Sequence, residues 1–181
     1  MADNGRQPIP VFCDKHLAYD FVDAQWMWDR ALELGIPLMA GSSLPVAYRS
    51  PFLEHPKEQC CIDEAVGVGF GAGGSFEAYG FHTLETMQCM AERRKGGESG
   101  VLSVQTIEGG AVWAAIKSGE ISADLADAAC NAIVNNQAKR DGTPERHWSE
   151  FVPKPAALLL RYTDGMKASI LWVDGWASCW S

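Results

Sequence analysis

The chain has 181 residues, of which 47% are hydrophobic and 21% charged, enough apolar material for one ordinary domain or for one domain with part of another. A net charge of −8 argues against nucleic acid as a partner, because neutralising phosphates requires clustered Lys and Arg. The sequence has no apolar run that could span a bilayer and no signal peptide at its start, so we expect a cytoplasmic protein with no membrane contact.

The first 43 residues predict a strand, a helix and a second strand. Residues 9–13 (IPVFC) form a short buried strand. A helix begins after Asp20, which can cap it, and ends before Gly35, with apolar residues at helical spacing between them. Residues 36–41 (IPLMAG) form the second strand. This order predicts a βαβ unit with parallel strands.

Residues 44–181 predict an α+β unit with a mostly antiparallel sheet and helices on one face, so the fold class of the chain is α/β plus α+β. The predicted elements are a strand over 61–70, a helix over 75–95, a strand over 100–109, helices over 111–117 and from 123, and a hairpin over 156–173. The turn of the hairpin is Asp164-Gly165. In the helix from 123, the residues expected to face inward are Leu125, Ala129 and Ala132 or Ile133.

A glycine-rich stretch over 67–85 (GVGFGAGGSFEAYGFHTLE) raises the question of a cofactor site. Gly69, Gly71 and Gly74 match G-x-G-x-x-G, the pattern of a dinucleotide-binding turn. Such a turn also needs an acidic residue about 20 positions further on, at the end of a second strand, to hold the ribose. Glu92 is near that distance but lies within the same predicted helix. Because the second strand is missing, we predict that this turn does not bind a dinucleotide.

Three segments resemble the glucose–fructose oxidoreductase / inositol dehydrogenase (Gfo/Idh/MocA) family. Residues 10–44 resemble a strand ending in E-K-P, then a helix, then a strand ending in glycine, and the tripeptide here is Asp14-Lys15-His16. Residues 73–85 resemble the family's G-G-x-x-x-D-x-G-x-H-x-x-D at the start of a helix in its second domain. Residues 158–173 resemble its closing strand–turn–strand.

This resemblance implies that residues 1–43 are the end of a Rossmann-like domain and that residues 44–181 are the sheet domain used for substrate binding or oligomerisation. Complete members oxidise or reduce a hydroxyl of a sugar or polyol with NAD or NADP. Their dinucleotide-binding half precedes the segment that resembles 10–44, so we expect a partial chain that binds no cofactor alone. The expected partners are a small sugar or polyol and further copies of the chain, through the sheet face. The alternative is a non-catalytic module for small-molecule binding or dimerisation.

The resemblance assigns catalytic roles to two residues. Lys15 would contact the cofactor and stabilise alkoxide character on the substrate hydroxyl, and His82 would take the hydroxyl proton. The substrate-binding candidates are Asp14, His16, Glu77, Tyr79 and Glu85. From the residues alone, Lys15 would be a solvent-facing lysine at a strand end and His82 a packed helix histidine.

Two positions depart from the family pattern. The family's aspartate falls on Ala78, and His16 replaces its proline, so a site of altered type is implied. A metal site is a further candidate, since His82, Glu85 and Cys89 lie on one helical stripe at i, i+3 and i+7. A zinc site needs three or four converging ligands, and nothing in the spacing adds a fourth, so we predict no metal.

Overall fold

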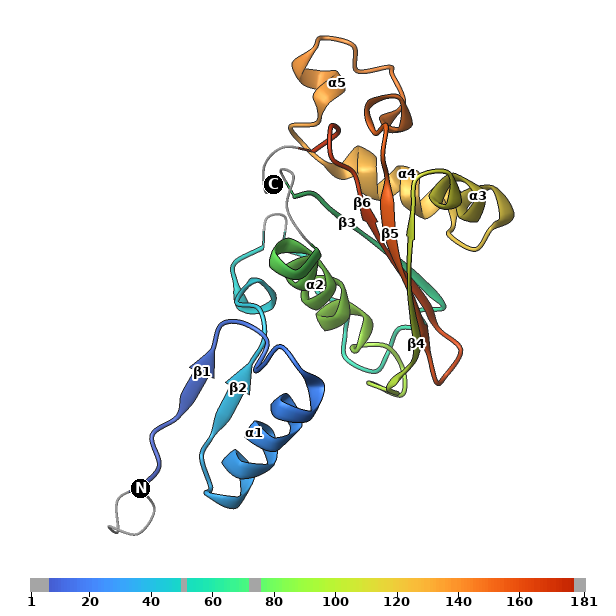
Figure 1. The fold of residues 1–181 in the computed structure, drawn as a ribbon. Helices are drawn as coiled ribbons and strands as arrows, with labels where there is room; N and C mark the ends of the chain where they lie inside the picture. Colours follow the sequence, from blue (N-terminus) through green and yellow to red (C-terminus); the bar gives the residue numbers. More distant parts are fainter. Residues whose placement is uncertain (1–6, 50–51, 72–75, 178–181) are drawn as a thin grey trace. The chain divides into compact units, whose positions relative to one another are not determined.

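The computed structural model describes residues 7–49, 52–71 and 76–177 of the chain. Two compact units make up the fold, Met1–Tyr48 and Arg49–Ser181, whereas the sequence places the boundary after residue 43. The chain mixes helices with two separate sheets, one of two strands and one of four (Figure 1). Within the described ranges, no helix combines the length and the apolar composition needed to cross a bilayer.

The first unit is a parallel βαβ unit, as predicted. Strand β1 (Val11–Cys13), helix α1 (Phe21–Glu33) and strand β2 (Leu38–Ala40) follow one another, and a short 3₁₀ turn, η2 (Leu44–Val46), comes after them. The two strands pair in parallel along their full length. The helix begins where predicted, because the Asp20 carboxylate accepts a hydrogen bond of 2.8 Å from the Val22 N–H.

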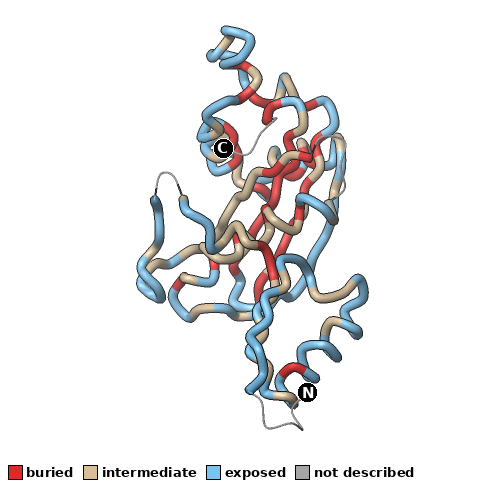
Figure 2. The backbone as a smooth tube through the Cα atoms, turned by 90° about the vertical axis from the view of Figure 1, so that its left-hand side faces the viewer, coloured by how far each residue is buried: buried red, intermediate tan, exposed pale blue. Residues whose placement is uncertain are grey.

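The first unit has little core of its own. Ala31 is the only residue of α1 that is buried, and Met27 and Trp28, which are at helical spacing from it, remain 39% and 40% exposed. Figure 2 shows this contrast, with buried positions concentrated in the second unit. A parallel sheet is normally covered on both faces, so the apolar side chains of this unit make a surface that further structure can cover.

The second unit is built around a four-stranded sheet in the order β3-β6-β5-β4. Its strands are β3 (Glu64–Gly69), β4 (Val101–Glu108), β5 (Ala156–Tyr162) and β6 (Lys167–Trp172). The β5–β6 and β4–β5 pairs are antiparallel, and the β3–β6 pair is parallel. The sheet is therefore mostly antiparallel, and the hairpin around Asp164-Gly165 forms where the sequence predicts it.

The helices of this unit are α2 (Phe81–Ala91), α3 (Gly110–Ser118), α4 (Ala123–Ala132) and α5 (Gln137–Arg140), with a π turn η3 (Phe76–Gly80) leading into α2 and a 3₁₀ turn η4 (Trp148–Phe151) before β5. The sequence predicts neither α5 nor η4 as a separate element. Both elements are only four residues long. Short elements give too few periodic positions to be recognised from sequence.

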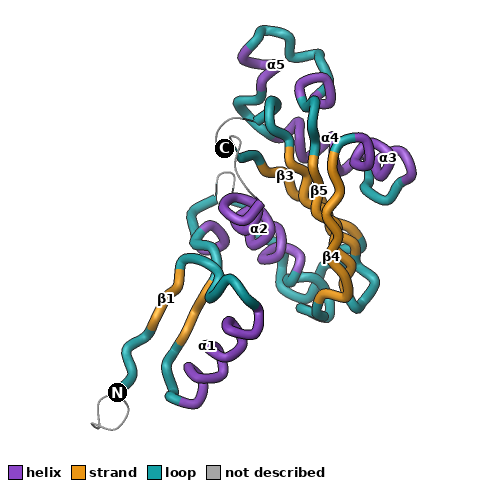
Figure 3. Tube along the Cα trace, in the orientation of Figure 1, coloured by secondary structure: helices purple, strands orange, loops and turns teal. Residues whose placement is uncertain are grey.

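Helices cover both faces of the sheet, so the prediction of helices on one face is wrong (Figure 3). On one face, Met87 of α2 packs in a cluster with Leu160 and Ile170. On the other face, helices α3 and α4 pack against Leu159 and Leu171. Neighbouring residues of one strand point to opposite faces, so the adjacent leucines 158–160 of β5 contribute to the hydrophobic clusters on both faces of the sheet.

The predicted inward face of α4 is right only at Ile133, which packs against the core cluster. Ala126 and Cys130 are fully buried, whereas Leu125 is 38% exposed. Side chains with few atoms let the helix lie close to the sheet, and the larger leucine stays at the margin of the contact. The predicted positions Leu125 and Ala129 are therefore offset by one residue from the buried positions Ala126 and Cys130, or roughly 100° of rotation.

Candidate functional site

The carboxyl ends of β1 and β2 lie side by side because the strands are parallel. Asp14, Lys15 and His16 follow β1, and all three are exposed. The chain leaving β2 is tied to this tripeptide: the Gly41 N–H donates to the Lys15 carbonyl at 3.2 Å, and the Ser43 N–H donates to Asp14 Oδ1 at 3.0 Å. The carboxyl end of a parallel sheet is where α/β proteins bind ligands, so the tripeptide occupies a position suited to binding.

The Lys15 ammonium is held by its neighbour. Its Nζ donates to the Asp14 carbonyl at 2.8 Å and lies 3.9 Å from Asp14 Oδ2, with both side chains about half exposed. Solvent weakens an exposed ion pair of this kind, so little free energy opposes an exchange of partners. The ammonium can therefore turn toward a hydroxyl of a bound ligand.

Helix α2 carries the second group of candidates. Thr83, Met87 and Ala91 form its buried stripe against the sheet. At 100° per residue, His82 and Glu85 fall on the opposite side of the helix, where both are partly buried. The His82 ring lies 5.2 Å from the Phe81 ring, centroid to centroid. The sequence prediction that His82 and Glu85 share one face of a helix agrees with this placement.

The remaining substrate-binding candidates are less defined. Tyr79 lies in the π turn before α2 and is 41% exposed, and its carbonyl accepts a weak hydrogen bond of 3.4 Å from the Thr83 hydroxyl. The Glu77 side chain lies outside the described part of the structure, as does the Gly73-Gly74 pair. Lys15 belongs to the first unit and His82 to the second.

The glycines of the G-x-G-x-x-G match have a packing role. A Cβ on Gly69 would lie 2.6 Å from Thr83 Oγ1 and 3.0 Å from the Trp172 ring. A Cβ on Gly71 would lie 3.2 Å from the same ring and 3.3 Å from the Tyr79 ring. The space next to these glycines is thus filled by side chains of α2, η3 and β6, and it lets the helix lie against β3.

The described part of this turn differs from a phosphate-binding loop in what lies next to its glycines. In such a loop, the missing side chains leave room for the pyrophosphate. Here the room is taken by Thr83, Trp172 and Tyr79, and the Gly71 N–H already donates to Asp174 Oδ1 at 2.8 Å. Gly74, the third glycine of the match, lies outside the described residues, and the absence of dinucleotide binding stays a prediction.

The metal-ligand candidates on α2, His82, Glu85 and Cys89, do not converge on one point. Cys89 Sγ accepts from the Arg49 guanidinium at 3.3 Å and donates to the Thr86 carbonyl at 3.0 Å. Burial raises the pKa of the Cys89 thiol, an effect that the charge of Arg49 partly offsets. A protonated thiol is a poor metal ligand. Across the described ranges, no three His, Cys, Asp or Glu side chains converge as a metal site would require.

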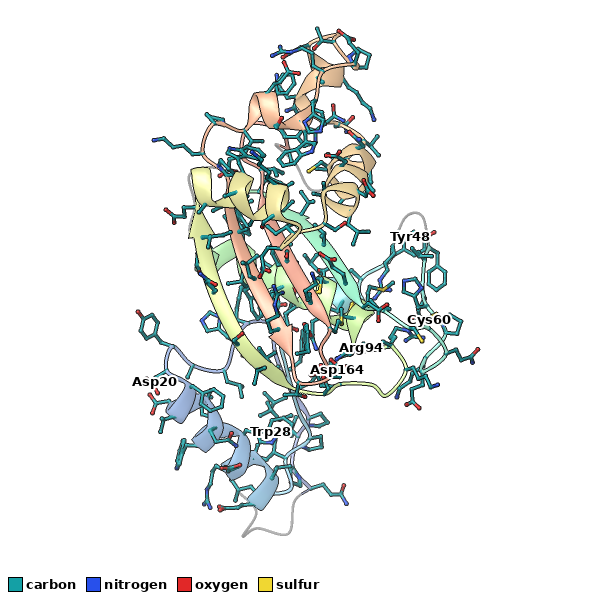
Figure 4. The ribbon with its side chains drawn as sticks, turned by 90° about the vertical axis from the view of Figure 1, so that its right-hand side faces the viewer. Asp20, Trp28, Tyr48, Cys60, Arg94 and Asp164 are labelled. Carbon is teal, nitrogen blue, oxygen red and sulfur yellow. The ribbon has the colours of Figure 1, made fainter. Side chains whose placement is uncertain are left out.

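The sequence analysis did not predict one buried hydrogen-bond network, which is centred on Arg94. Arg94, with its side chain 3% exposed, donates to Asp164 at 2.8 Å, to the Ala91 carbonyl at 2.9 Å and to the Ser99 hydroxyl at 2.9 Å (Figure 4). Its guanidinium carbon also lies 4.9 Å from the centre of the Tyr162 ring. Arg94 thus ties the end of α2 to the turn of the hairpin, and its contacts are those of a structural residue.

Comparisons of this chain with protein-family models, with curated proteins and with solved structures find no match.

Proposed function

We propose that this chain is a relative of the Gfo/Idh/MocA oxidoreductases that binds a small sugar or polyol, and that its glycine-rich stretch packs a helix and does not hold NAD or NADP. The observation that carries the proposal is the position of Asp14-Lys15-His16, at the carboxyl end of β1 beside that of β2. That is where a ligand binds in a parallel α/β sheet. The resemblance supplies the family, and the order of elements supports it, since α2 with His82 follows a glycine-rich stretch in the second unit.

Lys15 is proposed to bind a hydroxyl of the ligand. An ammonium donates up to three hydrogen bonds, and one of them already goes to a backbone carbonyl next to it. In the complete family this group would stabilise negative charge as it develops on the hydroxyl oxygen. The adjacent His16, in place of the family's proline, adds a second polar group to the same loop.

His82 is proposed to exchange a proton with the ligand. An imidazole can take or give a proton near neutral pH. Its place on the side of α2 away from the sheet leaves it outside the hydrophobic cluster formed by Met87 and Ala91. Glu85, one turn further on, shares that side of the helix and is proposed to orient the ring.

The cofactor chemistry of the complete family is hydride transfer to or from NAD(P). At Gly69 and Gly71, the space that a phosphate cradle would need is filled by side chains. The second candidate, a non-catalytic module that binds a small molecule or a further copy of the chain, needs no cofactor site. Because helices lie on both faces of the sheet, less open sheet face is available for a dimer than if helices covered one face alone.

We further propose a cytoplasmic location. The cysteines of the described residues are all free thiols: Cys13, Cys60, Cys61, Cys89 and Cys130. Reduced thiols are usual in cytoplasmic proteins, whereas secreted domains of this size commonly carry disulfides.

Saturation-transfer NMR with a panel of aldoses and cyclic polyols tests the proposed binding. The expected result is saturation transfer to one ligand class with the wild type, and clear weakening in Lys15→Met and His82→Gln. Lys57→Met, at an exposed lysine outside the proposed site, is the matched control and should bind like the wild type. Equal binding by all four proteins, or no binding of any panel member, would count against the sugar or polyol site.

A further inference from the structure

Strand β4 is a long edge strand with an open side. It ends the sheet order β3-β6-β5-β4, so one of its sides bonds to β5 and no other described strand pairs with the second. Seven of its eight residues are exposed, and Leu102 and Val104 are 71% and 57% exposed. An exposed edge of this length presents unpaired backbone N–H and C=O groups to other chains.

The pairing with β5 shows which backbone groups face outward. The Gly109 N–H donates to the Pro155 carbonyl at 2.7 Å, and the register continues from that pair to Ile107 opposite Ala157 and Gln105 opposite Leu159. In an antiparallel ladder, hydrogen-bonded pairs recur every second residue. The odd-numbered residues therefore bond inward, and the N–H and C=O of Val104, Thr106 and Glu108 point to the open edge.

The usual devices that protect an edge are absent from the centre of β4. Proteins blunt exposed edges with lysine, proline, bulges or inward charges. The strand has no Lys and no Pro, its one charge, Glu108, is at its last position, and its irregularity lies at the other end, between Val101 and Ser103. Residues 103–107 thus form a regular and uncharged edge that is free to pair.

We propose that this edge pairs with β4 of a second copy of the chain, antiparallel and around a two-fold axis at Gln105. In that register, Gln105 lies opposite Gln105 of the partner as a non-hydrogen-bonded pair. Val104 and Thr106 lie opposite each other and exchange the outward backbone hydrogen bonds. The two four-stranded sheets become one continuous sheet.

Charge supports a second copy as the occupant. A two-fold pairing centred on Gln105 sets Glu108 toward Leu102 of the other copy, so the only charged side chains of the two strands stay at opposite ends. Like charges placed directly opposite each other would destabilise the pair. The facing Gln105 side chains carry both donors and acceptors, so they can bond to each other.

Oxidative cross-linking tests the register. In the proposed pairing, the Cα atoms of the two copies of residue 105 lie about 4.5 Å apart, within the range of a disulfide. The two copies of residue 108 lie six positions apart along the strands, roughly 20 Å. Gln105→Cys is therefore expected to form a disulfide-linked dimer, and Glu108→Cys is expected to give only the background of the native cysteines. Cross-linking of both variants to the same degree, or of Glu108→Cys alone, would overturn the register.

The oligomeric state tests the edge itself. Light scattering after size exclusion should show a dimer for the wild type and a monomer for Thr106→Pro, which removes one outward N–H at an edge where proline is tolerated. Far-UV circular dichroism and the melting temperature show whether that variant is folded, and Thr106→Val, which keeps the N–H, should remain a dimer. A monomeric wild type, or a folded Thr106→Pro that stays dimeric, would overturn the proposal. Neither measurement involves a sugar or a dinucleotide, so the result does not depend on the proposed sugar or polyol site.

Discussion

Replacing Gly69 with alanine tests the packing role of the glycine-rich stretch. The new Cβ would lie 2.6 Å from Thr83 Oγ1, 3.0 Å from the Trp172 ring and 3.3 Å from Thr83 Cβ. The hydroxyl can rotate away, but Thr83 Cβ is fixed to the backbone of α2 and the ring of Trp172 is buried. Relief therefore requires a shift of the helix relative to β3.

The expected cost follows from two opposing effects. Overpacking in a close-packed interior destabilises by about 1–3 kcal/mol. Replacing glycine with alanine also restricts the unfolded chain and returns about 0.4–1 kcal/mol where the backbone permits a side chain. Gly69 has no positive φ, so this second effect applies. We expect Gly69→Ala to lower the free energy of unfolding by about 1–2 kcal/mol.

Urea unfolding followed by circular dichroism measures this change. Gly110→Ala, at the first turn of α3 where a Cβ would meet no atom within 4 Å, is the matched control and should be neutral or slightly stabilising. A Gly69→Ala protein as stable as the wild type would refute the reasoning.

Three further predictions concern the second unit. Arg94→Met should lower the free energy of unfolding by about 2–3 kcal/mol in urea, and Arg94→Lys should not restore it, because one ammonium cannot reach all three partners. The hydrogen bond from Arg94 lowers the pKa of Asp164 in the folded protein below the unfolded pKa of 3.8. The Asp164 carboxylate therefore stabilises the fold above pH 3.8, and this contribution is lost as the pH falls through the lower folded pKa. Melting curves of Asp164→Asn should lack this part of the acid sensitivity. Burial raises the pKa of Cys130 to about 12, so iodoacetamide should label exposed Cys61 in the native protein and Cys130 only after unfolding, as read by mass spectrometry.

The outcomes that would contradict these three predictions are distinct. Wild-type stability in Arg94→Met would mean that the guanidinium contacts contribute nothing. An identical acid profile for the wild type and Asp164→Asn would remove the carboxylate from the pH dependence. Fast labelling of native Cys130 would contradict its burial.

Local signals in the sequence predicted much of the fold. The cap at Asp20 and the turn at Asp164-Gly165 act within a few residues, so their effect can be recognised without knowledge of the rest of the chain. The parallel pairing of β1 and β2 follows from the strand–helix–strand order, which leaves little choice of topology.

The errors arose where tertiary packing decides. The run of three leucines at 158–160 is typical of a strand buried on both faces, and this signal could have predicted helices on both sides of the sheet. On α4, Ala126 and Cys130 face the core in place of the larger Leu125, and only the distance between helix and sheet explains that choice. A pattern of hydrophobicity contains no information on that distance.

The candidate site was predicted in part. The sequence located Asp14-Lys15-His16 at a strand end and put His82 and Glu85 on one face of a helix, and both placements agree with the structure. It could not predict the buried contacts of Arg94, because its partner Asp164 is 70 positions away in the chain. Pairing over that distance depends on the sheet register, which no local motif specifies.

Titration with NADH and NADPH, followed by tryptophan fluorescence, tests most directly whether the glycine-rich stretch packs a helix or holds a cofactor. Trp172 lies against Gly69 and Gly71, so a dinucleotide bound at this turn would change its emission. After correction for light absorption by the ligand, we expect no saturable change for the wild type, and the same flat titration for Gly69→Ala. Tight, saturable binding by the wild type that is lost in Gly69→Ala would contradict the packing role and identify the stretch as a dinucleotide site.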